Sequence, residues 1–142
     1  MKNLKILVSL ALLLSLAIGC TGQMDAVIRR DAKRVEIIYT DSRIASAELI
    51  TVLPSGERFQ GKSRRFDRAQ EVMAAGSANS ADKSARYDAL QTFSGNAKAT
   101  LAGNRGSTME CRFHITDIII GYSSGGMGIC QVSDGRVLDV FF

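Results

Sequence analysis

The chain has 142 residues, enough for one domain with a modest core once an N-terminal leader is removed. Its formal net charge is +4, and Lys2 and Lys5 in the leader account for half of it. Nucleic-acid partners usually require a clustered basic face, so this mild excess of positive charge argues against them.

The first 19 residues have the composition of an export signal. Lys2 and Lys5 form a positive start, and residues 6–18 are apolar apart from two serines. This stretch is short for a bilayer span and has the length of the hydrophobic part of a signal peptide. Residues 1–19 are therefore expected to be cleaved. An ordinary signal peptide with an incidental cysteine and an uncleaved anchor helix are the alternatives.

The end of the leader, LAIGC at 16–20, resembles the lipobox of bacterial lipoproteins. The resemblance implies cleavage between Gly19 and Cys20, followed by acylation of Cys20, so the chain would take up palmitate and have a lipid bilayer as its partner. In the Gram-negative sorting pattern, Thr21 rather than an aspartate implies the outer membrane. Two or three acyl chains hold a protein stably at a bilayer.

The residues after the cysteine change from polar to strand-like. Residues 20–34 are polar and charged, and we expect a lipidated tether with at most one helical turn. Residues 35–142 are expected to form a single domain. Its first strand is expected at 35–40, because β-branched and aromatic residues are enriched there.

The middle of the chain combines a hairpin with an insertion. A hairpin is expected over residues 47–62, with turn residues at 54–57 and Phe59 facing the core. Residues 63–95 are rich in Ala, Ser and charge, and predict an insertion with helix near 66–93.

The C-terminal third returns to strands. Residues 107–115 alternate strictly, which indicates a half-buried strand. Residues 117–120 are expected to continue this strand or to start another, and residues 121–128 to form a flexible loop. Asp-Gly at 134–135 favours a two-residue type I′ turn in a last hairpin.

That turn fixes an expected register. Val132 would pair with Val137, and Cys130 with Asp139. The whole pattern predicts an α+β, mainly β domain: a small antiparallel sheet of about five to seven strands in hairpins, with one helical insertion.

Two cysteines remain once Cys20 is assigned to lipid. Cys111 and Cys130 form an even pair in an exported domain, which predicts a disulfide. Two buried free thiols are the alternative. No CxxC motif or histidine stands at ligand spacing, so we expect neither a metal nor another cofactor.

No catalytic set is expected from the sequence. His114 is the only histidine and lies on the charged face of its strand. The glycines at 125–128 lack the Lys-Ser or Lys-Thr of a phosphate loop. This favours a non-enzymatic envelope module that binds an envelope protein or a cell-wall component. A periplasmic hydrolase and an inhibitor of a host or phage enzyme are the alternatives.

Two groups of basic residues are dense enough to contact anionic lipid headgroups. A solvated charged face is the favoured interpretation of both. The groups are Arg64, Arg65 and Arg68, and Arg29, Arg30, Lys33 and Arg34.

Overall fold

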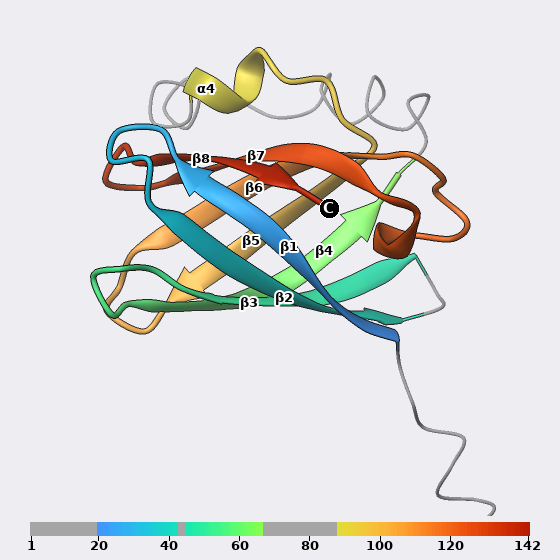
Figure 1. Ribbon diagram of the computed structural model, residues 1–142, viewed down its shortest axis with the longest axis horizontal. Helices are drawn as coiled ribbons and strands as arrows, with labels where there is room; N and C mark the ends of the chain where they lie inside the picture. Colours follow the sequence, from blue (N-terminus) through green and yellow to red (C-terminus); the bar gives the residue numbers. More distant parts are fainter. Residues whose placement is uncertain (1–19, 43–44, 67–87) are drawn as a thin grey trace, which may run out of the picture.

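A computed structural model describes residues 20–42, 45–66 and 88–142, so the leader and most of the expected insertion lie outside the described residues. The described chain forms a closed antiparallel barrel of eight strands, each paired with its sequence neighbours, and β1 pairs with β8 (Figure 1). The mainly β, antiparallel expectation is confirmed, whereas the sheet of about five to seven strands is a closed barrel of eight. The strands are β1 (Cys20–Ile28), β2 (Arg34–Ser42), β3 (Ser46–Val52), β4 (Arg58–Arg65), β5 (Ala97–Gly103), β6 (Thr108–Ile115), β7 (Gly126–Val132) and β8 (Val137–Phe141).

Alternation along each strand fills the barrel. Successive side chains point to opposite faces, so every second residue enters the interior. In β2 the inward residues are Val35, Ile37 and Tyr39, and Phe59 of β4 is fully buried as expected. The inward side chains of the strands form one continuous hydrophobic cluster.

The first strand was not predicted from the sequence. Residues 20–28 form β1 rather than part of a polar tether, so the domain begins at Cys20 and not at residue 35. Met24, Ala26 and Ile28 are buried, while the polar residues Thr21, Gln23 and Asp25 face solvent. Because these outward residues dominate the composition, the short inward set was hidden. β1 pairs with both β2 and β8.

Three of the hairpins use the same turn. Gly56, Gly106 and Gly135 each have positive φ, and each donates its N–H to the carbonyl three residues earlier. This is a type I turn followed by a glycine bulge. The turn at 54–57 is confirmed, but the type I′ turn at 134–135 is wrong. The extra residue shifts the last hairpin by one, so Cys130 pairs with Leu138.

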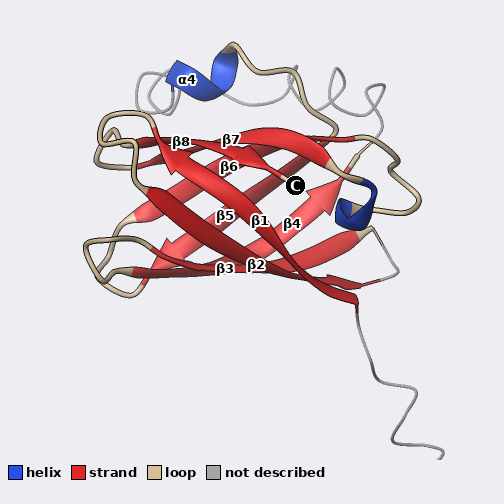
Figure 2. Cartoon of the chain, viewed as in Figure 1, coloured by secondary structure: helices blue, strands red, loops and turns tan. Residues whose placement is uncertain are grey.

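Helix is scarce in the described chain. α4 (Asp88–Gln91) lies outside the wall (Figure 2), and Leu90 packs on Ile129 of β7. α4 falls within the range 66–93 in which helix was expected. Residues 67–87 of that range lie outside the described residues. A 3-10 helix, η2 (Tyr122–Ser124), lies at one end of the barrel. It interrupts the loop expected at 121–128, and β7 already begins at Gly126.

The expected disulfide is present. Cys111 of β6 lies directly opposite Cys130 of β7, with their Cα atoms 4.0 Å apart. Both side chains are buried in the core, and the bridge ties the two strands together from inside the barrel.

Candidate membrane-facing rim

The two ends of the barrel differ in character. The end that carries the strand termini Cys20, Ser42, Ser46, Arg65, Ala97, Ile115, Gly126 and Phe141 is called the proximal rim. The opposite end, the distal rim, carries the short connections at 29–33, 53–57, 104–107 and 133–136. Charged side chains pair at the distal rim, where a hydrogen bond from Arg136 holds the pKa of Asp134 below its usual value.

Cys20, the residue expected to carry lipid, lies on the proximal rim. It is exposed, forms no disulfide, and is the first residue of β1. It pairs in register with Asp41 of β2. The leader that precedes it lies outside the described residues, so the expected cleavage after Gly19 stays a prediction.

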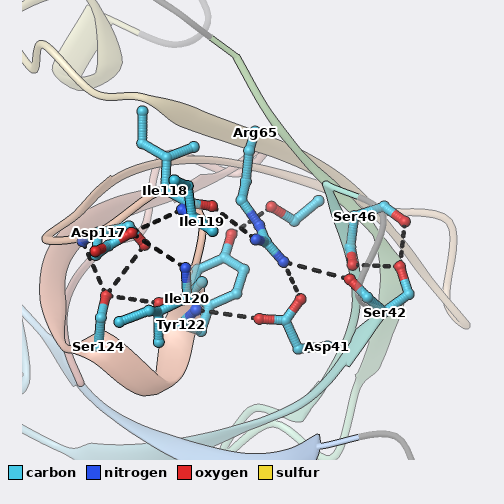
Figure 3. A network of polar contacts seen from close by, with 12 residues as sticks. Asp41, Ser42, Ser46, Arg65, Asp117, Ile118, Ile119, Ile120, Tyr122 and Ser124 are labelled. Carbon is cyan, nitrogen blue, oxygen red and sulfur yellow. Dashed lines mark hydrogen bonds and ion pairs between the residues drawn. The ribbon is translucent and has the colours of Figure 1, made fainter.

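A buried ion pair organises the proximal rim. Arg65, at the end of β4, pairs with Asp41, at the end of β2, and their side chains are only 4% and 7% exposed. The other oxygen of Asp41 accepts the backbone N–H of Tyr122 at 3.2 Å, and Arg65 donates to the carbonyl of Ile118 at 2.8 Å (Figure 3). One carboxylate and one guanidinium therefore fasten the segment from 117 to 124 across the rim.

Tyr122 closes the mouth of the barrel. Its ring is buried against Tyr39, Phe113 and Phe142, with ring centroids 5.2–5.5 Å apart. Its hydroxyl is hydrogen-bonded to Ser63 of β4. Burial raises the pKa of this hydroxyl well above its usual value.

The segment between β6 and η2 forms a rigid turn with three isoleucines at its tip. Asp117 accepts the N–H groups of Ile119 and Ile120 on one carboxylate oxygen, at 2.8 and 3.1 Å. Its carbonyl accepts the N–H of Gly121 at 2.9 Å. The strand expected at 117–120 is wrong, because this aspartate bonds its own backbone in a turn.

Exposed apolar side chains gather at the proximal rim. Ile118, Ile119 and Ile120 are 40%, 92% and 59% exposed. Met127 and Phe141 are also exposed, and they pair across β7 and β8 close to the same end. Within the described ranges, five of the seven exposed large hydrophobic side chains thus belong to this end of the molecule.

Basic side chains lie beside these apolar ones. Arg64 of β4, Lys98 of β5 and Arg112 of β6 stand in register across three neighbouring strands near the proximal rim. Arg64 and Lys98 are exposed, and Lys98 lies 5.6 Å from the ring centre of Phe66.

The two groups of basic residues singled out in the sequence lie in different parts of the structure. Arg65 turns inward to Asp41, Arg64 faces outward, and Arg68 lies outside the described residues. Arg29 belongs to the distal end, where it pairs with Asp139 at 2.8 Å.

Of the other candidates, His114 lies close to this rim, where it pairs in register with Met127, and a hollow lies away from it. His114 is exposed on the outer face of β6. A shallow hollow of about 540 Å³ lies on the outer wall of β1–β3, and its apolar lining includes Ile38 and Val52. In the described part of the chain, no group of three or more His, Cys, Asp or Glu side chains is placed to hold a metal ion.

No family model, curated protein or solved structure matches the chain. Within the described ranges, no helix is long and apolar enough to cross a membrane.

Sequence reasoning singled out Cys20 as a candidate but missed the isoleucine turn. Its signal was present, since an aspartate before three apolar residues and a glycine is typical of a turn closed by the aspartate side chain. The run of isoleucines outweighed it, because such residues favour strands. The partners of Asp41 could not be found locally, since Arg65 and Tyr122 lie 24 and 81 residues away.

Proposed function

We propose that the protein is a lipid-anchored module of the bacterial cell envelope, acylated on Cys20 and held at the outer membrane. The observation that carries the proposal is the position of Cys20: it follows the lipobox-like leader directly and lies exposed at the first position of the barrel. A sulfur buried in the core could not accept a diacylglycerol, whereas this one is accessible.

The anchor and the barrel are directly joined. Because β1 begins at Cys20, no residue separates the lipid from the first paired strand. The barrel therefore rests at the bilayer surface by its proximal rim, instead of moving on a tether. The distal rim, with its charged turns, points away from the membrane.

The module acts by binding rather than by catalysis. The most densely connected polar side chains at the proximal rim, Asp41 and Arg65, are engaged with the backbone of the segment they fasten. The inward side chains form a continuous core, so recognition of an envelope protein or a cell-wall component falls to the outer surface. The hollow on β1–β3 is the surface we assign to it, since apolar and charged groups alternate there.

The anchor is tested by Cys20→Ser. The variant should remain unprocessed by the lipoprotein peptidase and take up no radioactive palmitate, because the acceptor sulfur is gone. The matched control replaces Cys111 and Cys130 with serine, which removes the disulfide and both of its cysteines but should leave the label intact. Equal labelling of the Cys20→Ser protein and the wild type would exclude the lipoprotein function. Crosslinking in intact envelopes then identifies the partner.

A further inference from the structure

We propose that the proximal rim docks on an anionic bilayer and inserts the Ile118–Ile120 turn among the lipid acyl chains. The inference rests on the proposed anchoring of Cys20 and adds a second, protein-made contact with the membrane. Figure 1 shows the segment between β6 and η2 projecting from the same end of the barrel at which β1 begins.

The exposed apolar surface of the turn supplies the driving force for insertion into the bilayer. Ile119 is 92% exposed at the tip, with Ile118 and Ile120 on either side of it. Apolar surface gains free energy when it leaves water, and a gathered apolar patch usually marks a contact surface. Met127 and Phe141 extend the same patch along the outer wall.

Part of the backbone of the turn is already hydrogen-bonded within the protein. A polar group that enters hydrocarbon must already be hydrogen-bonded within the protein. The N–H groups of Ile119 and Ile120 are bonded to Asp117, and the carbonyl of Ile118 accepts from Arg65. The turn therefore enters lipid with these groups satisfied.

The turn is also held in place from below. The pair of Asp41 and Arg65 is nearly inaccessible to solvent and grips the segment on both sides of the isoleucines, at Ile118 and Tyr122. Insertion therefore requires little ordering of the segment, which lowers its entropic cost.

Two features on the page identify lipid as the occupant. The apolar stretch at 6–18 stops two residues before Cys20, so the chain would leave the membrane at this rim whether the leader is replaced by acyl chains or retained. Arg64 and Lys98 stand one residue from the strand termini, where they would meet headgroups once the isoleucines are immersed. Basic side chains near a surface favour anionic lipids.

The absence of tryptophan from the chain gives a clean test. Ile119→Trp places a single fluorophore at the tip of the turn, and Val52→Trp places one on β3 near the distal rim, at a residue 54% exposed. Each full-length protein is expressed, processed by the cell, purified and reconstituted in phosphatidylcholine–phosphatidylglycerol vesicles. The Ile119→Trp emission should shift to the blue and be quenched by lipids brominated on their acyl chains. The Val52→Trp emission should do neither.

A charge variant sharpens the result. In the Ile119→Trp protein, Arg64→Gln with Lys98→Gln should reduce the blue shift in anionic vesicles. Equal emission and quenching of the Ile119→Trp and Val52→Trp proteins would overturn the inference. Palmitate labelling of the same preparations tests the acylation of Cys20 independently of insertion. Protein that is labelled but not quenched therefore contradicts only the insertion of the turn. Absence of label contradicts the proposed function, while the quenching still decides the insertion.

Discussion

Two Arg–Asp pairs show how the surroundings of a residue set its contribution to stability. Arg65 and Asp41 are buried and also bond the backbone, whereas Arg29 and Asp139 are 50% and 34% exposed. A solvated pair contributes little, because water and salt screen it and two side chains must be ordered. Removing one partner of a buried pair leaves an uncompensated charge.

Asp41→Asn should therefore destabilise the barrel by about 3–5 kcal/mol, because Arg65 would stay buried without a counter-charge. The matched change Asp139→Asn at the exposed pair should cost less than about 1 kcal/mol. Urea denaturation of the two proteins measures the difference in the free energy of unfolding. Similar losses in both would show that burial of the first pair has no energetic consequence.

At the scale of the elements, the sequence predicted strands and turns that depend on neighbouring residues, but it did not predict pairing that depends on distant ones. The turn at 54–57 followed from its turn residues and the strand around Cys111 from alternation, and the Cys111–Cys130 bridge followed from the even number of cysteines left after Cys20. β1 did not, because a strand with only three buried residues is recognisable only through its partners β2 and β8. The register of the last hairpin failed by one residue, since Asp-Gly can begin a two-residue turn or end a bulged one.

The disulfide should stabilise the barrel through the unfolded state. It joins residues 19 apart, and closing such a loop contributes about 3 kcal/mol in the chain-entropy model. Replacing both Cys111 and Cys130 with alanine should lower the urea midpoint accordingly. Dithiothreitol should lower the midpoint of the wild type but leave that of the double variant unchanged. An equal response of the two proteins would show that the bridge is not the group being reduced.

At the scale of the whole molecule, closure depends on the last strand. β8 pairs with β7 on one side and with β1 on the other. Val140 is fully buried opposite Ala26 and Gly128, and Phe142 packs on the Tyr122 ring. The sequence predicted a last hairpin, but not that β1 would pair with its final strand and complete a barrel, because closure is a property of all eight strands together.

Deleting Val140–Phe142 should abolish cooperative thermal unfolding, because it opens the seam between β1 and β8 and removes a core side chain. Phe141→Ser is the matched control, since this side chain is 53% exposed on the outer wall. It should melt close to the wild type, as most surface substitutions do. A truncated protein that melts cooperatively like the control would place the core elsewhere. Shortening the segment 76–80 should cost little stability, because the entropy of loop closure depends weakly on loop length. This segment lies outside the described residues.

The proposed export of the chain would give the seam between β1 and β8 a place in an order of events, because this seam joins the first strand to the last. An exported chain emerges from its N-terminus, so Cys20 reaches the far side of the membrane first and residues 137–141 last. Until then β1 has a partner on one side only, and the nascent sheet has two open edges, which favour pairing with other chains. Lipid attachment at Cys20 would fix one of these edges at the bilayer while the other is still being threaded out. Pairing of the final five-residue strand, β8, with β1 then closes the sheet into a barrel.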